Sequence, residues 1–268
     1  MKNEKVIITG ASSGIGEATA FYLAEKGAHV ILLARNEEKL KTIQKEIIDK
    51  KQLCDFYKID LKNPSEIEQV FKQIFTEIGT PTVLINNAGV GTFQPIDKMT
   101  SEEIIEPIKV PFQAAILCSY YCVKQMKKNQ NGRILFITSP VSYFPLPYMI
   151  SYTASRYGIK AASFALREEL KKDDIKVNLV VFGKVNSAYL QNNHADFSWY
   201  PKASKWFPEI STQKAAEKIY KTLQKNRKEN IFPFRLNFFL SCYKLAPNFL
   251  IRIFKMFGLY EPMYDFKK

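Results

Sequence analysis

The chain has 268 residues, a hydrophobic fraction of 46% and a formal net charge of +13. That length suits one large α/β domain or two small ones, and the hydrophobic content is enough for a sizeable core. No apolar run is long enough to span a bilayer, no secretory signal precedes the first predicted strand, and the four cysteines lack metal-ligand spacing. These features argue against a membrane-spanning, secreted or metal-binding protein and favour a cytoplasmic one.

The positive charge is spread over many predicted helices, so much of it is solvated surface. No nucleic-acid recognition motif accompanies it, and we predict no nucleic-acid partner. An anionic cofactor or an anionic membrane surface accounts for the charge at least as well.

A strand, a glycine-rich turn and an amphipathic helix open the chain, at Val6–Thr9, Gly10–Gly16 and Glu17–Lys26. Gly10 permits the turn, Gly14 lets the backbone approach a pyrophosphate, and Gly16 allows close packing of helix on strand. The N–H groups and positive dipole end at the helix N-terminus suit phosphates. The turn therefore predicts a dinucleotide site, with contacts from Gly10, Ser12, Ser13, Gly14, Ile15 and Gly16.

Apolar strands alternate with amphipathic helices along the rest of the chain. The further predicted strands are His29–Ala34, Asp55–Ile59, Val83–Asn86, Ile134–Thr138, Val177–Phe182 and Ile231–Pro233. Helix starts are marked by Asn63 before a proline and by a capping box at Thr100–Glu103. The alternation predicts a doubly wound parallel α/β sheet, the Rossmann fold, with right-handed crossovers. No linker or repeat divides it, so we expect residues 1–233 to form one cofactor-binding and catalytic domain.

The end of the second predicted strand bears on the choice of cofactor. An NAD-preferring site usually places Asp or Glu there to hold the adenosine 2′-hydroxyl. Arg35 stands there instead, and its forked guanidinium suits a 2′-phosphate. A surface arginine in a loop is the alternative interpretation. The sequence favours NADP(H) over NAD(H), with Asp60 and Leu61 flanking the adenine.

Four separated signals agree with one another. They are the glycine turn, Asn86-Asn87-Ala88-Gly89 at the end of the fourth strand, Ser139 after the fifth, and Tyr152 thirteen residues later. Together they resemble the short-chain dehydrogenase/reductase family over most of residues 4–232. The resemblance implies a single-domain Rossmann oxidoreductase with Ser, Tyr, Lys and Asn chemistry. It also implies cofactor contacts from Asn87, Ala88, Gly89, Gly183, Val185 and Ser187, with Val185 at the nicotinamide carboxamide.

In that family the tyrosine is the general acid/base, the serine orients the substrate oxygen, and the lysine stabilises the tyrosinate and binds the nicotinamide ribose. By motif the serine is Ser139 and the tyrosine Tyr152, but Arg156 stands at the lysine position and Pro111 at the asparagine position. Arg156 keeps a cation one helical turn from Tyr152, yet a guanidinium does not pass a proton on. Pro111 has no side-chain donor or acceptor. We expect a partial rather than a total loss of activity.

Residues 188–210 stand where the family has its substrate lid. Aromatic residues are concentrated there, at Tyr189, Phe197, Trp199, Tyr200, Trp206 and Phe207. Tyr143, Phe144 and Tyr148 would add apolar wall between Ser139 and Tyr152. An aromatic lid predicts an apolar substrate, although simple packing of these rings on the sheet is the alternative.

Residues 234–268 extend beyond a minimal family member and combine apolar runs with interspersed cations. Such an amphipathic segment can lie in a membrane interface, cap the substrate cleft or form a dimer contact, and all three roles are open.

The leading hypothesis is NADPH-dependent reduction of a carbonyl, or oxidation of an alcohol, in an apolar and lipid-like substrate. Ser139, Tyr152 and Arg156 are its catalytic residues. A catalytically weakened NADP-binding module and a membrane-interface protein that uses residues 234–268 are the alternatives. The resemblance implies a homodimer or homotetramer, formed through the helices of Thr100–Lys128 and Tyr152–Lys171.

Overall fold

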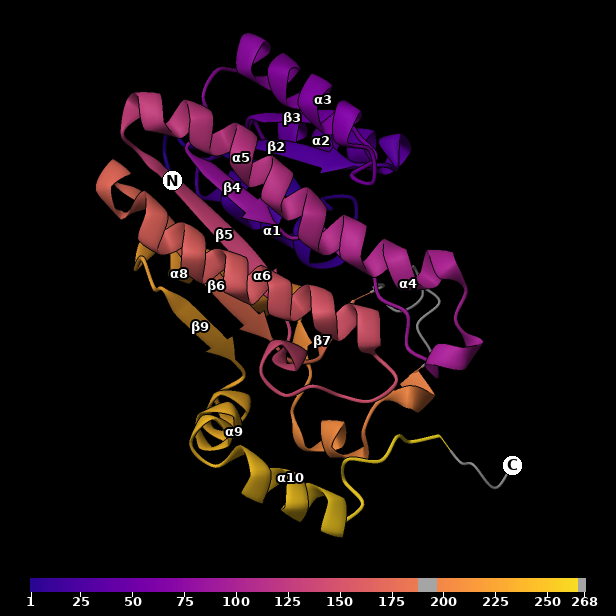
Figure 1. Cartoon of the computed structure of the whole chain (residues 1–268). Coiled ribbons are helices and arrows are strands. Elements are labelled where there is room, and N and C mark those ends of the chain that lie inside the picture. The colour runs from indigo at the N-terminus through magenta and orange to yellow at the C-terminus, as the bar shows by residue number, and fades with distance from the viewer. Residues whose placement is uncertain (188–196, 265–268) are drawn as a thin grey trace.

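Seven parallel strands form the central sheet, in the order β3-β2-β1-β4-β5-β6-β9 (Figure 1). The computed structural model describes residues 1–187 and 197–264. The strands are β1 (Lys5–Thr9), β2 (His29–Ala34), β3 (Cys54–Lys58), β4 (Val83–Asn86), β5 (Gly132–Thr138), β6 (Ile175–Phe182) and β9 (Glu229–Phe232). The predicted doubly wound α/β sheet is confirmed, and every strand end lies within two residues of its predicted position.

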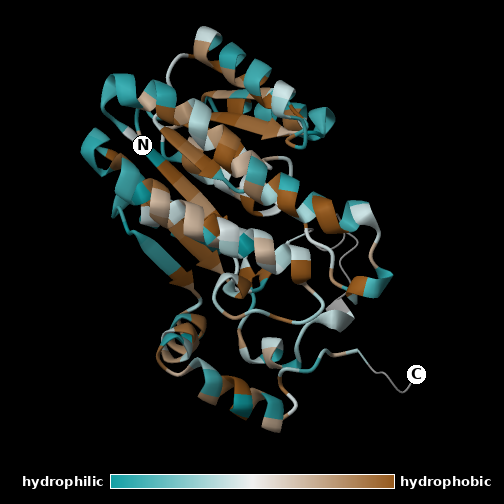
Figure 2. Ribbon diagram, viewed as in Figure 1, coloured by the Kyte–Doolittle hydropathy of each residue, from teal (hydrophilic) through white to brown (hydrophobic). Residues whose placement is uncertain are grey.

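Helices cover both faces of this sheet. One face carries α1 (Gly14–Glu25), α2 (Glu37–Asp49) and α8 (Thr212–Gln224), and the other carries α3 (Pro64–Glu77), α5 (Ala114–Met126) and α6 (Ile150–Glu169). Alternate residues of β1 enter the two core layers, Val6 and Ile8 the first and Ile7 the second. Helices bury both faces of the inner strands, which are therefore mostly hydrophobic (brown in Figure 2), whereas the edge strand β9 is largely hydrophilic.

The two helix-start signals are confirmed. The side chain of Asn63 accepts the N–H of Ser65 at 3.0 Å before α3. Thr100 and Glu103 form a reciprocal capping box before α4 (Ser101–Ile108). Short 3₁₀ turns occur at Ile96–Lys98, Lys127–Asn129, Pro140–Ser142, Leu170–Asp173, Phe197–Trp199 and Lys202–Trp206.

The backbone departs from an ordinary α-helix between α4 and α5. Lys109–Gln113 form a π-helical turn, and Pro111 is buried within it. Proline lacks the N–H that an i→i−4 hydrogen bond needs, so a regular ladder cannot pass through this residue. The π-helical turn thus coincides with Pro111.

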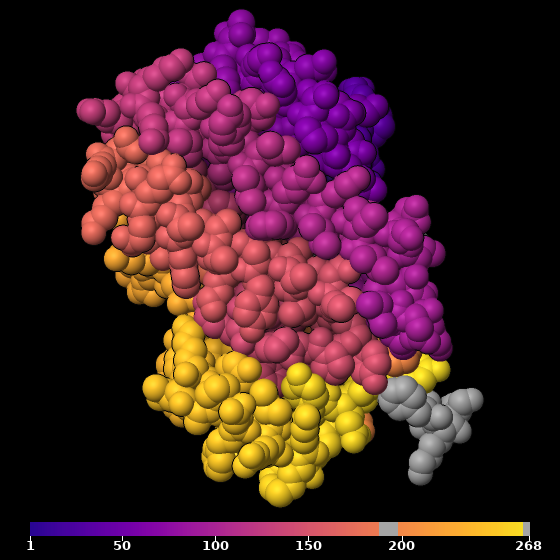
Figure 3. Space-filling model, viewed as in Figure 1, coloured from indigo at the N-terminus to yellow at the C-terminus, as the bar shows by residue number. Residues whose placement is uncertain are grey.

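Two helices follow the last strand, α9 (Phe234–Leu245) and α10 (Pro247–Met256). Leu236, Leu240 and Phe254 are buried in the same core layer as α5 and α6, so this extension is part of one domain. Figure 3 shows both helices at one end of the molecule, in yellow. Within residues 1–187 and 197–264, no helix combines the length and the apolar character needed to cross a membrane.

A small parallel pair, β7 (Val185–Asn186) with β8 (Ile210–Ser211), was not predicted. It brings the end of the predicted lid beside the residues that follow β6. Residues 188–196 of that lid, Tyr189 among them, lie outside the described residues.

Candidate active site

A cavity of about 780 Å³ lies at the carboxyl ends of the parallel strands. In open α/β sheets this edge, at the point where the strand order reverses, is where ligands bind. The predicted site residues line the cavity with one exception, which is Gly16. A Cβ at Gly16 would lie 2.2 Å from the carbonyl oxygen of Gly10. Gly16 therefore packs against the turn and supports it, and a direct cofactor contact there stays a prediction.

The glycine turn is tied to the end of β4. Gly10 has φ +66°, and a Cβ there would lie 2.8 Å from Cα of Ala88, so only glycine fits. The side-chain amide of Asn87 donates to the carbonyl oxygens of Thr9 (2.9 Å) and Gly10 (3.2 Å). The Thr9 hydroxyl accepts the N–H groups of Asn87 and Ala88, each at 3.0 Å. Asn87 thus shapes the turn as well as lining the cavity.

Helix α1 starts at the cavity wall. Gly14 and Ile15, its first two residues, line the cavity, so the N–H groups of the first turn lie at its edge. Ser187 stands opposite, since a Cβ at Gly14 would lie 3.3 Å from the Cβ of Ser187. Such a helix end binds anions well.

Two cations line the far end of the cavity. Arg35 follows β2 and is exposed, and Lys39 lies in the first turn of α2. The side chain of Asn36 accepts the N–H of Lys39 at 3.0 Å and fixes the start of that helix. Asp60 and Leu61 complete this end. The sequence reasoning missed Lys39, although its position just inside a capped helix after Arg35 was a usable signal.

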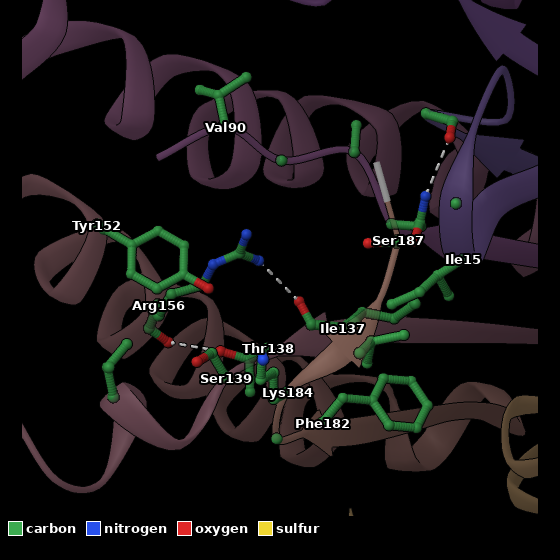
Figure 4. A pocket seen from close by; sticks show the side chains of 18 of the residues that line it. Ile15, Val90, Ile137, Thr138, Ser139, Tyr152, Arg156, Phe182, Lys184 and Ser187 are labelled. Atoms are coloured by element: carbon green, nitrogen blue, oxygen red, sulfur yellow. Dashed lines mark hydrogen bonds between the residues drawn. The ribbon is translucent and has the colours of Figure 1, made fainter. Parts of the chain in front are cut away.

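Ser139, Tyr152 and Arg156 gather on one side of the cavity (Figure 4). Ser139 follows β5, and the other two lie one turn apart on α6. Tyr152 is 6% exposed, and its ring meets the edge of Phe93 with centroids 5.2 Å apart. The Cζ of Arg156 lies 4.8 Å from the centroid of the Tyr152 ring. The cation expected beside the phenol is therefore present.

The Arg156 guanidinium is anchored to the sheet. Its Nη1 donates to the carbonyl oxygen of Ile137 at 3.2 Å, and Thr138 Oγ1 donates to the main-chain oxygen of Arg156 at 3.2 Å. A Cβ at Gly89 would lie 2.4 Å from Nη2. The guanidinium thus occupies space between the ends of β4 and β5 that a larger residue 89 would fill. A guanidinium does not deprotonate in proteins, so this is a fixed positive charge.

Lys160, one turn beyond Arg156 on α6, belongs to a different cluster. Its ammonium donates to the carbonyl oxygen of Ser142 at 3.3 Å and lies 3.4 Å from the centroid of the Tyr143 ring. Burial, and secondly the positive charge of Lys244, lower the pKa of Lys160 to about 8. Lys160 is not among the residues that line the cavity.

The other end of the cavity is apolar and is capped by the C-terminal helices. Its wall includes Phe144, Leu146, Phe207, Leu236, Phe239 and Phe254. Phe144 meets Phe239 and Phe254 with ring centroids 5.5 and 5.7 Å apart. Of the roles left open for residues 234–268, capping the cleft is therefore seen directly in α9 and α10.

Several aromatic residues expected in this wall lie elsewhere. Tyr143 is buried beneath Lys160, and Tyr148 packs on Trp199, which is itself buried. Trp206 is mostly exposed. Tyr200 does line the cavity, together with the Phe144 and Phe207 already described. The alternative, packing against the protein, thus holds for part of the aromatic set.

A protein-family model described as short chain dehydrogenase matches residues 4–197. The chain belongs to this family. Members of this family are dehydrogenases and reductases, oxidoreductases that act on CH–OH or C=O groups. The matched segment contains both the glycine turn and the Ser139–Tyr152–Arg156 group, which line the same cavity.

Three curated relatives are similar over 65–72% of the chain. The uncharacterized oxidoreductase YohF of Escherichia coli is 33% identical over 67% of this chain and 72% of its own length. The bovine 3-ketodihydrosphingosine reductase is 30% identical over 65% of this chain and 54% of its own length. A dehydrogenase/reductase SDR family protein 7-like of Anopheles gambiae is 29% identical over 72% and 62%. The chain spans less than two thirds of the last two relatives.

Solved structures share the fold. A short-chain dehydrogenase from Sphingobium yanoikuyae in complex with NADPH superposes with a TM-score of 0.80 at 22% identity, over 93% of this chain and 95% of that chain. A metagenomic short-chain oxidoreductase in complex with NADP gives 0.70 at 28% identity, over 82% and 90%. The first comparison establishes the Rossmann architecture independently of sequence.

Proposed function

We propose that this chain is an NADPH-dependent reductase of an apolar, lipid-like carbonyl compound, and that it also catalyses the reverse oxidation of the alcohol. One observation carries the proposal. A single cavity joins the glycine turn, the cations at Arg35 and Lys39, the Ser139–Tyr152–Arg156 group and an apolar end. In this proposal the glycine turn binds the pyrophosphate, the two cations bind the 2′-phosphate, the Ser139–Tyr152–Arg156 group faces the reacting carbonyl, and the apolar end holds the rest of the substrate.

The residues of the cavity fit NADP(H). The N–H groups at the start of α1 would hold the pyrophosphate, and Arg35 with Lys39 would hold the 2′-phosphate. Val185 and Ser187 would hold the nicotinamide end, and Arg156 the nicotinamide ribose. Two of the solved relatives are complexes with NADPH or NADP, which supports this choice. When bound, the cofactor supplies the hydride that reduces the carbonyl carbon.

The side chains of the cavity supply the proton chemistry. The Tyr152 hydroxyl donates a proton to the carbonyl oxygen, and the Ser139 hydroxyl donates a hydrogen bond that orients the same oxygen. The Arg156 charge stabilises the phenolate that remains on Tyr152. The edge-to-face packing of Phe93 with the Tyr152 ring helps to keep the phenol in place.

A catalytically weakened NADP-binding module is the second candidate function, and Pro111 is the observation that favours it. The family resemblance implies an asparagine at this position that helps hold a proton-relay water, and the buried ring of Pro111 offers no side-chain group for that water. A lost proton-transfer element typically costs about 10²–10⁴ in rate. Arg156→Lys combined with Pro111→Asn separates the two functions. A large gain in turnover supports the weakened module, and a drop supports a site adapted to Arg156.

The proposal includes a substrate, a second copy of the chain and a membrane surface as binding partners. The aromatic end contributed by Phe144, Phe239 and Phe254 supports an apolar carbonyl or alcohol substrate, and a relative is named as a 3-ketodihydrosphingosine reductase. A second copy of the chain and an anionic membrane surface are the other partners in this proposal. The four cysteines are free, which supports the cytoplasm as the compartment.

The test combines one substitution in each half of the site. Tyr152→Phe is expected to abolish ketone reduction while the Kd for NADPH stays within about twofold, because only the proton donor is lost. Arg35→Ala is expected to weaken NADPH about ten- to a hundredfold, the value of a charge-assisted hydrogen bond, and to leave NADH binding unchanged. Fluorescence titration and NADPH oxidation at a fixed ketone concentration measure both effects.

Tyr22→Phe is the matched control, since Tyr22 lies on α1 and packs on Tyr220 away from the cavity. It should change neither readout. Full turnover by Tyr152→Phe would refute the mechanism, and equal weakening of NADPH and NADH by Arg35→Ala would refute the assignment of the 2′-phosphate.

A further inference from the structure

Helices α9 and α10 bury one side against the cavity and leave apolar side chains exposed on the other. Leu245, at the turn between them, is 88% exposed, and Met256, at the end of α10, is 72% exposed. Phe249 and Phe257 are also mostly exposed. We call these four residues the apolar ridge. Exposed apolar clusters of this kind mark contact surfaces.

The ridge runs along one side of α10. Phe249 and Met256 are seven residues apart, which places them two helical turns apart on the same side. The buried residue of α10 is Phe254, which lines the cavity. One short helix therefore has one side in the apolar end of the site and another in contact with solvent.

The charges next to the ridge are positive. Residues 234–256 contain Arg235, Lys244, Arg252 and Lys255 and no Asp or Glu. Arg252 and Lys255 are exposed on α10 itself. Glu261, which follows the helix, pairs with Lys202 at 3.0 Å. Lys244 lies 3.5 Å from Glu229 and is not counted with the ridge.

A second copy of the chain would fit this surface poorly. A two-fold contact brings the same patch onto itself, so Arg252 and Lys255 would face the same cations across the interface. Phospholipid headgroups of an anionic bilayer provide the opposite charge, and the acyl boundary accepts the aromatic side chains. Apolar side chains flanked by cations on a helix are complementary to such a surface.

We infer that the apolar ridge docks on an anionic phospholipid surface. Phe249, Met256 and Phe257 enter the interface, and Arg252 and Lys255 lie at the headgroups. The docked side of α10 then lies opposite the cavity wall at Phe254. This inference concerns binding alone and holds whether or not the site turns over.

Vesicle co-sedimentation tests it with the full chain. The probes are phosphatidylcholine vesicles with and without phosphatidylserine. The ridge variant is Phe249→Ser with Met256→Ser and Phe257→Ser, and the charge variant is Arg252→Gln with Lys255→Gln. We expect the wild-type chain to bind the phosphatidylserine vesicles in preference. We expect its partition coefficient to fall about tenfold or more in the ridge variant, which loses three interfacial side chains.

The charge variant should lose the preference for phosphatidylserine, and added salt should do the same to the wild-type chain. Ile48→Ser with Leu53→Ser is the matched control and should sediment like the wild type, because this exposed apolar pair lies beside β3, at the opposite edge of the sheet from β9.

Folding of each variant is checked by NADPH titration and thermal unfolding, which do not depend on turnover. Equal sedimentation of the wild type and the ridge variant, or none of the wild type, would overturn the inference. A wild-type oligomer that dissociates in the ridge variant without vesicles would overturn it as well, because the ridge would then be a contact between copies.

Discussion

Arg156 lies with its guanidinium between the ends of β4 and β5, hydrogen-bonded to the carbonyl oxygen of Ile137 and close against Gly89. The sequence could place this arginine one turn from Tyr152, because helical spacing is regular. The sequence could not show the hydrogen bond to Ile137 or the close contact with Gly89, because these two residues belong to β5 and the end of β4, which are far apart in sequence. The positions of Lys39, which lines the cavity, and Gly16, which does not, could not be read from the sequence for the same reason. Which side of a turn faces a cavity depends on contacts that no local pattern encodes.

Gly89→Ala tests the fit of Arg156. The added Cβ would lie 2.4 Å from Nη2, so the guanidinium must leave its present position, in which Cζ lies 4.8 Å from the centroid of the Tyr152 ring. The end of an arginine side chain can shift, so we expect little change in stability. We expect kcat to fall about tenfold, the scale of one displaced contact. Steady-state kinetics and thermal unfolding measure the two quantities.

The same substitution in an Arg156→Lys background provides the control, because a lysine has no Nη2 to displace. Its further loss should be smaller than in the wild-type background. Equal losses in both backgrounds would mean that Gly89 acts independently of Arg156.

The helices and strands differ in how well they can be predicted from the sequence. The central strands were predictable because burial on both faces makes each a short apolar run, as in Val83–Asn86. The pairing of Val185 with Ile210 was not, because two-residue strands carry no periodicity of their own. Helix α9 is apolar around much of its circumference, so its sequence could not choose between Leu236 and Phe238 as the buried side. Only the packing on the sheet decides that Leu236 is buried and Phe238 is exposed.

The contact of α6 with α9 is expected to make stability depend on pH. Burial and Lys244 lower the pKa of Lys160 from 10.5 to about 8, so the fold favours the neutral amine. Between those two values the unfolded chain binds more protons at this site, and stability rises with pH. Below about 8 both states are protonated, and the contribution of Lys160 is constant. Lys160→Met removes this titration, so the wild type should gain stability relative to it from neutral pH to 10.5.

Urea unfolding of both proteins across that range measures the difference. Lys244→Gln removes the neighbouring charge, so it should raise the pKa of Lys160 and move the rise to higher pH. A difference between wild type and Lys160→Met that does not change with pH would contradict the assignment.

At the scale of the whole molecule, a second apolar surface lies on the helices that carry the site. Exposed side chains of α4, α5 and α6 are Ile105, Ile108, Ile116, Tyr120, Ile150, Tyr157 and Phe164. This surface is separate from the apolar ridge, which extends from the end of α9 along α10. The two surfaces differ in charge as well, because the α4–α6 surface carries both signs, with Glu102 and Glu103 on α4 and Lys124 on α5, whereas residues 234–256 have no carboxylate side chain. Self-association therefore suits the α4–α6 surface better than the ridge.

We predict that the chain forms a homodimer or homotetramer through α5 and α6. Light scattering after gel filtration should give a mass two or four times the 30.9 kDa of one chain. Ile116→Glu with Phe164→Glu places like charges on both sides of a two-fold contact and removes apolar area, so this variant should elute as a monomer.

In a single copy of the chain both side chains are exposed, so the substitutions leave the core intact. Leu53→Glu, at a more exposed and remote position, should keep the wild-type mass. A wild-type chain of 30.9 kDa in solution, or a variant that keeps the oligomer, would contradict this assembly.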